Sequence, residues 1–201
     1  MLLTLTSLLL FSSASADDTS QYTSDDLFES TVLNITNSYR QQHNASALEW
    51  NSTLASFASS HASDCAFAHS GGPYGENLAA GYPNVTASII AWGHERTEYN
   101  FQKANFDTKT GHFSQLVWKA TQQVGCGRTN CSGSGDAPGW FLVCEYYPGG
   151  NVLGRFEENV QGQVMGAVGD VPDDRGAAGR LGAVGLGWVV VLVGAVVGVV
   201  L

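Results

Sequence analysis

The chain has 201 residues and a formal net charge of -9 at pH 7, with 9 lysines and arginines against 18 aspartates and glutamates. The cations are scattered singly, whereas binding to a nucleic acid depends on clustered cations that release counterions from the polyanion. The composition therefore argues against a nucleic-acid partner and predicts a soluble, acidic protein.

The first 16 residues are predicted to be a secretory signal peptide. Residues 2–11 are almost wholly apolar, and Ala14-Ser15-Ala16 places small residues at the alternate positions that a signal peptidase needs. A structural helix is the alternative, since the apolar run is too short to span a bilayer. We expect the mature protein to begin near Asp17, with a short N-terminal segment at 17–24.

Four helices are predicted in the next part of the chain, because apolar residues recur there at helical spacing behind capping residues. They run from Asp25-Asp26 towards Asn44, from Asn51 or Ser52 to Cys65, from Pro83-Asn84 to Glu95, and from Gly111 to Trp118.

Two strands follow, at 123–127 and 140–146, and the second is rich in aromatic and β-branched residues. The turn-rich segment 132–136 connects them. Helices alternating with short strands predict an α+β fold, a three-layer αβα sandwich around one sheet. We expect a single domain over 25–158, followed by a flexible Gly/Asp-rich stalk at 159–180.

The end of the chain predicts a lipid anchor. Gly176-Ala177-Ala178 offers three consecutive small residues, and 181–201 ends in an uncharged Val/Leu/Gly tail. This is the layout of a GPI-attachment signal, with attachment near 176 and loss of the tail. A spanning helix is the alternative. The expected location is extracellular, on the outer face of the cell membrane or in the cell wall.

Cysteines and glycosylation sequons agree with secretion. Four cysteines in a secreted chain predict two disulfides, and three pairings are possible. Asn-x-Ser/Thr sequons, whose sugars must sit on the surface, occur at Asn34, Asn44, Asn51, Asn84 and Asn130.

Three motifs in the middle of the chain resemble those of one family. The first is His69-Ser70-Gly71-Gly72-Pro73-Tyr74-Gly75-Glu76-Asn77-Leu78-Ala79, in which Gly75-Glu76-Asn77 is taken as a turn. Gly111-His112-Phe113-Ser114-Gln115-Leu116-Val117-Trp118 follows, with Gly125-Cys126-Gly127, and then Phe141-Leu142-Val143-Cys144-Glu145-Tyr146-Tyr147-Pro148-Gly149-Gly150-Asn151. Their order and separation resemble the CAP superfamily of cysteine-rich secretory, antigen 5 and pathogenesis-related 1 proteins, and in particular its fungal sterol-binding branch.

The resemblance implies an αβα sandwich and assigns roles to particular residues. It implies disulfides between Cys65 and Cys131 and between Cys126 and Cys144. It also implies a cleft tetrad in which two imidazoles hold a weakly bound divalent cation, zinc or magnesium, and two carboxylates add charge and hydrogen bonds: His69, Glu76, Glu95 and His112. That chemistry is plausible, since neutral imidazole binds zinc and an adjacent acid can orient the ring. Buried, satisfied hydrogen-bonding groups are the alternative.

Aromatic residues just before the second motif suggest a ligand. Tyr99, Phe101 and Phe106 occupy a segment that resembles the loop by which fungal relatives take up sterol. Such a loop is able to close three rings over a flat apolar molecule. Packing of these rings onto the domain is the alternative.

The preferred functional prediction is a non-enzymatic binder of sterols or related small lipids, with no other cofactor. The alternative is a hydrolase in which His69 or His112 is a general base and Ser114 or a metal-bound water is the nucleophile, oriented by Glu76 or Glu95. The chain has no Gly-x-Ser-x-Gly or His-Glu-x-x-His motif to support it. A surface module recognised by a protein partner is a third hypothesis.

Overall fold

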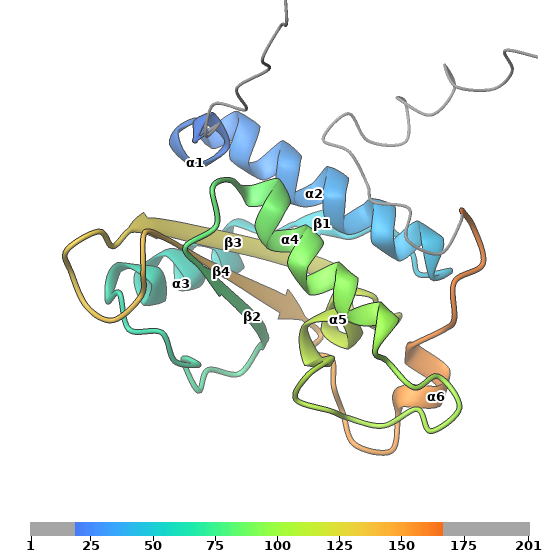
Figure 1. Cartoon of the computed structure of the whole chain (residues 1–201). Coiled ribbons are helices and arrows are strands. Elements are labelled where there is room, and N and C mark those ends of the chain that lie inside the picture. The colour runs from blue at the N-terminus through green and yellow to red at the C-terminus, as the bar shows by residue number, and fades with distance from the viewer. Residues whose placement is uncertain (1–18, 167–201) are drawn as a thin grey trace, which may run out of the picture.

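The computed structural model describes residues 19–166 (Figure 1). The predicted signal peptide, the attachment site near 176, the hydrophobic tail and most of the predicted stalk lie outside the described residues. Within 19–166, none of the helices combines the length and the apolar character needed to cross a membrane.

The N-terminal layer begins with a short helix, α1 (Ser20–Thr23), and continues with the long helix α2 (Asp25–Gln42). The cap of α2 is Ser24, whose side chain accepts a hydrogen bond from the backbone of Leu27. The prediction that Asp25-Asp26 is the cap is therefore wrong by one residue. Both acids lie in the first turn, where negative charge favours the helix N-terminus.

The other predicted helices are found close to their expected positions. Helix α3 (Ser52–Ser63) is capped by Asn51, and α4 (Val85–His94) is capped by Asn84. The chain continues from α4 into a 3-10 helix, η1 (Glu95–Thr97). Helix α5 (Gly111–Leu116) ends before Trp118, and a further short helix, α6 (Phe156–Asn159), was not predicted.

One mixed sheet forms the middle layer. Its four strands are β1 (Glu49–Trp50), β2 (Gly75–Ala80), β3 (Gln123–Asn130) and β4 (Trp140–Tyr147), in the order β1-β3-β4-β2. Strand β1 is parallel to β3, while β3 and β2 both run antiparallel to β4. The segment Gly75-Glu76-Asn77, predicted as a turn, is the first half of β2. Strand β1 was not predicted, and β3 is longer than expected.

Helices cover both faces of the sheet, which confirms the predicted αβα sandwich (Figure 1). Side chains alternate along β4, as expected for a strand. Leu142 and Tyr146 join the large core formed with α2, α4 and α5, whereas Phe141 and Val143 join a smaller core formed with α3. The sheet thus separates two apolar cores, and the candidate site lies at one end of it.

Both disulfides implied by the family resemblance are present. Cys65 pairs with Cys131, and Cys126 pairs with Cys144. The second pair lies directly across neighbouring strands, since Cys126 and Cys144 are register partners in β3 and β4.

The packed part of the chain extends past the predicted domain end at 158. Val160 is buried, and the carbonyl of Gln161 lies 2.8 Å from Nδ1 of His43. The backbone of Val164 then donates to the carbonyl of Gln42. Residues 159–164 therefore pack along the end of α2.

Glycines explain how closely α3 approaches β3. A Cβ atom on Gly127 would lie 2.2 Å from the backbone nitrogen of Ser59. We expect Gly127→Ala to lower the free energy of unfolding by about 3 kcal/mol, because helix and strand must separate to admit the methyl group. Urea denaturation with the disulfides intact measures this. Gly162→Ala is the control, since a Cβ there meets nothing within 4 Å. Equal losses in the two variants would contradict the explanation.

Candidate functional site

The first half of the predicted tetrad is a histidine–carboxylate pair at the start of β2. Nδ1 of His69 lies 2.6 Å from Oε1 of Glu76. The backbone of Ser70 also donates to both oxygens of Glu76, at 3.0 and 3.3 Å. The Glu76 side chain is nearly buried, at 6% exposure, whereas that of His69 is 67% exposed. The carboxylate is therefore fixed, and the imidazole faces solvent.

A second acid, to which the sequence had given no role, lies beside Glu76. Glu145 is the register partner of Glu76 across β2 and β4, and it is fully buried. Neither of its oxygens receives a hydrogen bond from another group among the described residues. Burial, together with the neighbouring Glu76, raises the pKa of Glu145 to about 9. At this pKa Glu145 is protonated at neutral pH, and its proton is available to the neighbouring carboxylate of Glu76.

The paired acid keeps Glu76 ionised. Burial alone would raise the pKa of Glu76, but hydrogen bonds with Glu145, Ser70 and His69 outweigh it and hold the pKa below its ordinary value. The result is a single negative charge shared by two carboxyl groups and presented to His69. A lone acid in the apolar strand sequence Phe141–Tyr146 was the only signal of this arrangement in the sequence.

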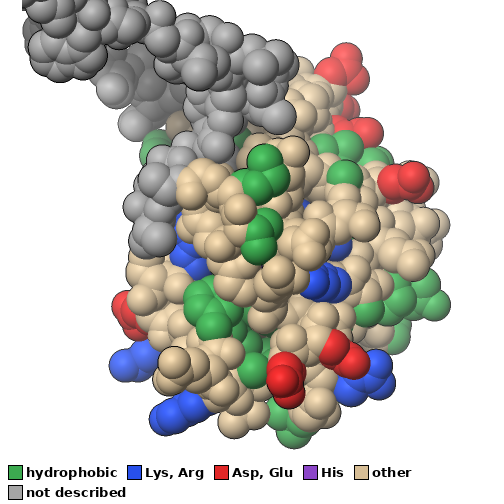
Figure 2. Space-filling model, turned by 90° about the vertical axis from the view of Figure 1, so that its right-hand side faces the viewer, with side chains coloured by type: hydrophobic (Ala, Val, Ile, Leu, Met, Phe, Trp, Pro, Cys, Tyr) green, Lys and Arg blue, Asp and Glu red, His purple; other side chains and the backbone are tan. Residues whose placement is uncertain are grey.

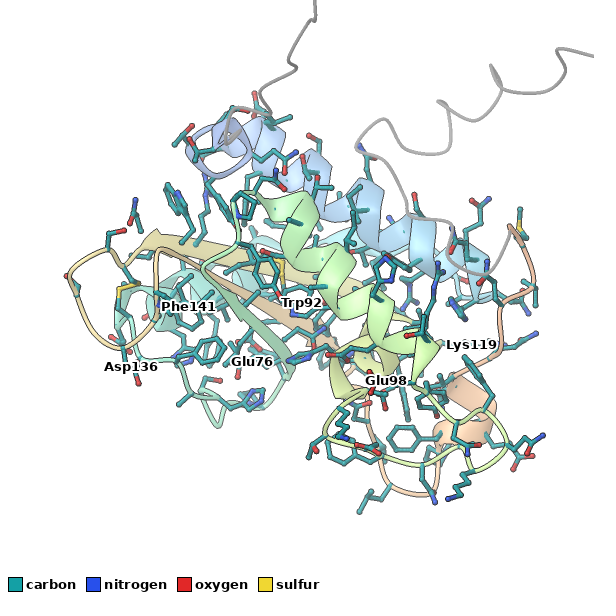
Figure 3. All side chains as sticks on the ribbon, in the orientation of Figure 1. Glu76, Trp92, Glu98, Lys119, Asp136 and Phe141 are labelled. Atoms are coloured by element: carbon teal, nitrogen blue, oxygen red, sulfur yellow. A yellow bond between two sulfur atoms is a disulfide. The ribbon has the colours of Figure 1, made fainter. Side chains whose placement is uncertain are left out.

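The second half of the tetrad joins η1 to α5. Nδ1 of His112 lies 2.6 Å from Oε1 of Glu95, whose other oxygen accepts a hydrogen bond from the backbone of Phe113 at 3.0 Å. The ring of His112 also stacks on Trp92, with centroids 6.1 Å apart. Figure 3 labels Trp92 on α4 and Glu76 on β2. In both pairs a carboxylate holds Nδ1, so Nε2 is the nitrogen that faces any ligand.

Asn77 connects the two pairs. It follows Glu76 in β2 and donates from Nδ2 to the carbonyl of His112, at 3.0 Å. The cleft itself is a hollow of about 290 Å³ that includes His69, Glu76, Gln115 and Asn151 in its lining. His112 and Glu95 lie outside that hollow. The structure thus places the tetrad as two linked pairs on neighbouring elements.

The tetrad was also predicted to hold a divalent cation. Among residues 19–166, no three His, Cys, Asp or Glu side chains are placed so that they could hold a metal ion together. The two imidazoles offer nitrogen ligands, and their Nδ1 atoms are oriented by acids as in many zinc sites. Binding of zinc or magnesium by this tetrad stays a prediction.

Polar residues around the cleft hold its walls together. Oε1 of Gln115 accepts a hydrogen bond from the backbone of Gly150 at 2.7 Å. A Cβ atom on Gly75 would lie 2.1 Å from the same oxygen, so glycine is required for this contact. Ser114 is buried, and its one hydroxyl hydrogen has two acceptors within reach, Oδ1 of Asn151 at 2.6 Å and the carbonyl of Gly111 at 3.2 Å. Its hydroxyl is therefore engaged by groups other than the two imidazoles, which gives no support to a serine nucleophile.

The three predicted ligand-binding aromatics lie in the loop between η1 and α5. Tyr99 is buried, whereas Phe101 and Phe106 are 37% and 46% exposed. The Phe101 ring lies 4.8 Å from that of Tyr99 and 6.1 Å from that of Phe113, and it stacks on His43. Tyr99 and Phe113 belong to the large core. The loop thus rests on an aromatic cluster that is continuous with the protein interior.

Phe106 lies apart from that cluster. Its ring centroid is 6.4 Å from that of Phe156 in α6. A hollow of about 240 Å³ lies within the loop, and it is lined by Tyr99, Phe106 and mainly polar neighbours that include Lys103 and Asp107. Ligand pockets typically have about 300 to 1,000 Å³ and a mostly apolar lining. In this conformation the loop is closed, so a sterol-sized ligand would require it to move.

Residues 33–146 match the Cysteine-rich secretory protein family, termed CAP. The chain belongs to the CAP family. The protein PRY2 of Saccharomyces cerevisiae is 43% identical over 139 residues, which cover 66% of this chain and 41% of PRY2. Secreted protein PRY1 of Candida albicans is 36% identical over 140 residues, covering 68% of this chain and 33% of that protein. These relatives confirm the fungal branch of the family.

The CAP chain spans less than half the length of both fungal relatives. Among solved structures, venom allergen-like protein 4 of Schistosoma mansoni has a TM-score of 0.51 and 24% identity, and it covers 65% of this chain and 93% of its own. At this identity the likeness supports the fold alone.

The predicted glycosylation sites differ in their surroundings. Asn34, Asn44 and Asn130 are exposed, while Asn51 and Asn84 are partly buried helix caps. Asn51 also donates from Nδ2, the atom that carries a glycan, to Gln123 at 2.8 Å. Glycosylation of all five sequons stays a prediction.

Proposed function

We propose that this CAP domain is an extracellular carrier of sterols or related small lipids, which enter beneath the 99–106 loop. The observation that carries the proposal is the exposure of Phe101 and Phe106 on a loop whose base, Tyr99, is part of the core. The exposed parts of these two rings gain apolar contacts when a flat ligand lies against them.

The way the loop is held supports such a movement. Its hydrogen bonds are local: Ala104 donates to the carbonyl of Asn100, whose side chain accepts from the backbones of Gln102 and Lys103. Ala104 has a φ of 44°, in the left-handed region that is costly for a residue with a Cβ. Backbone strain of this kind often marks segments that change conformation.

The extracellular location rests on other features of the chain. Both disulfides are closed in the structure, and disulfides persist mainly in oxidising compartments. One fungal relative is named a secreted protein. Together with the predicted signal peptide, these features favour export from the cell.

The loop assignment is tested by replacing Phe101 and Phe106 together with alanine. We expect the affinity for radiolabelled cholesterol or ergosterol to fall at least about tenfold, because two apolar contacts with the ligand are lost. Equilibrium titration of the disulfide-intact protein measures the affinity, and urea denaturation shows whether the fold is retained.

Phe67→Ala is the matched control. Phe67 is similarly exposed, at 49%, and it lies beside Phe141 on another part of the surface. The Phe67→Ala variant should bind sterol with the affinity of the wild type. Unchanged affinity in the double variant, or an equal loss in the control, would refute the assignment of the loop.

A further inference from the structure

A second group of exposed apolar side chains lies next to the 99–106 loop. Val152 and Leu153 follow the last motif and are 50% and 79% exposed. Leu153 is the most exposed of the large hydrophobic side chains that the structure describes. Single exposed leucines are common, but this one is adjacent in sequence to an exposed valine and lies between Asn151 and Phe156, two residues that the structure places near Phe106. We call Phe106, Val152 and Leu153 the apolar rim.

Contacts around Gly111 bring the two parts of the rim together. A Cβ atom on Gly111 would lie 3.1 Å from Cε2 of Phe106 and 3.9 Å from Nδ2 of Asn151. Asn151 also donates to the carbonyl of Gly111 at 2.9 Å, and Val152 follows it directly. Phe106 and the start of the 152–155 segment thus meet over the same residue. Figure 1 draws these two loops side by side next to α6.

The charge around the rim differs from that of the whole chain. Between residues 98 and 110 there are two cations, Lys103 and Lys109, and two acids, Glu98 and Asp107, so this segment has no net charge. The other segment, 152–159, has one cation and two acids, Arg155, Glu157 and Glu158, and a net charge of -1. The chain as a whole has a formal charge of -9. Figure 2, which views the molecule from the side of α6, shows apolar side chains among charges of both signs. The charges around the rim are thus nearly balanced, and the lysines of the 98–110 segment can pair with phosphate groups.

We propose that the apolar rim docks on a zwitterionic lipid bilayer, with Leu153 and Val152 entering the headgroup layer. Entry of these side chains removes apolar surface from water, and Leu153 has most to gain because it is the most exposed. Lys103 and Lys109 then lie at the level of the lipid phosphates. Docking in this orientation brings the 99–106 loop to the membrane in which a sterol is dissolved. The cargo rests on the proposed function, whereas the docking itself does not.

The first test places a probe on the rim. Leu153→Cys is labelled with an environment-sensitive fluorophore in the full chain and mixed with phosphatidylcholine vesicles. We expect a blue shift in emission, and the same label at Phe67→Cys should show none. Phe67 contacts Asp136 and Phe141, and Figure 3 labels these two residues at the opposite end of the molecule from Glu98. A shift at both positions, or at neither, would overturn the proposal.

The second test separates docking from sterol binding. The double variant Val152→Ser with Leu153→Ser should bind vesicles at least about fivefold more weakly than the wild type, because two inserted side chains have become polar. Its affinity for sterol in vesicle-free solution should be unchanged. If the wild type binds no sterol and the double variant still binds vesicles more weakly than the wild type, docking is upheld and the carrier function is refuted. Vesicle binding equal to that of the wild type would refute docking, whatever the sterol affinity.

Discussion

Replacement of Arg40 by alanine should lower the free energy of unfolding by about 4 kcal/mol, because four buried carbonyl groups lose their donor. Arg40 lies in the last turn of α2 and is fully buried. Its guanidinium donates to the carbonyls of Ser46, Leu116, Trp118 and Thr121, at distances of 2.7, 3.1, 2.9 and 2.9 Å. One side chain thus provides hydrogen bonds to the backbone carbonyls at the end of α5 and in the segment that follows it.

The guanidinium remains charged in this setting. Burial lowers the pKa of Arg40 to about 10, which is still well above neutral pH. Its partners are carbonyl dipoles, and those at the end of α5 carry the partial negative charge of a helix C-terminus. Removal of the side chain therefore leaves several desolvated acceptors, and each costs about 1 kcal/mol or more.

Two further variants separate hydrogen bonding from packing. Arg40→Met keeps an apolar stem of similar length and should still lose most of the 4 kcal/mol or so, because the carbonyls stay buried. Arg40→Lys retains a charge with fewer donors in a different geometry. Its free energy of unfolding should lie between those of the wild type and Arg40→Met. Urea denaturation with the disulfides intact measures all three. If Arg40→Met were as stable as the wild type, desolvation of the guanidinium would offset its hydrogen bonds.

Local signals in the sequence predicted local features of the fold. The start of α3 was predicted at a cap of Asn51 or Ser52 and that of α4 just after Pro83-Asn84, because a cap depends on the residue itself and the next three. Strands β3 and β4 were both predicted, β4 from its aromatic and β-branched residues. Strand β2 was missed because Gly75-Glu76-Asn77 contains no strand-favouring residue, and its pairing with β4 depends on residues about seventy positions away.

The residues of the candidate site were harder to predict, because their roles depend on contacts that are distant in the sequence. The tetrad came from a family resemblance, since spacing alone does not reveal which acid orients which histidine. The role of Glu145 depends on a register that places it opposite Glu76, and that of Arg40 on carbonyls up to 81 residues later in the chain. Such non-local contacts leave no periodic pattern in the sequence.

Glu145 gives the stability of the protein a specific dependence on pH. The ordinary pKa of its carboxyl is 4.5, and in the folded protein burial raises the pKa to about 9. Between these values the folded state holds a proton that the unfolded state has released. The stability that this proton contributes is fully present below pH 4.5 and is lost as the pH rises through about 9.

Two other titratable groups affect the stability of the protein in a lower pH range. The pKa of His43 is lowered by burial from 6.5 to about 4, so its contribution raises stability with increasing pH only below 6.5. The pKa of Glu76 is lowered, so its contribution is present above 4.5 and is lost as the pH falls below that value. The His43 effect is shared by the wild type and a variant at Glu145, so it cancels in the difference between the two. The Glu76 effect depends on Glu145, but it is confined to pH values below 4.5.

Glu145→Gln removes the proton uptake while keeping an uncharged donor of the same size beside Glu76. From pH 5 to 8.5 we expect the wild type to lose about 4 kcal/mol of stability relative to Glu145→Gln, since each pH unit within the window contributes up to about 1.4 kcal/mol. Urea denaturation at several pH values measures the difference, and Glu49→Gln, an exposed acid on β1, should show no such trend. A constant difference between wild type and Glu145→Gln would mean that Glu145 is ionised in the fold. Two adjacent negative charges would then face His69, and the cleft would be a stronger cation site than the shared proton allows.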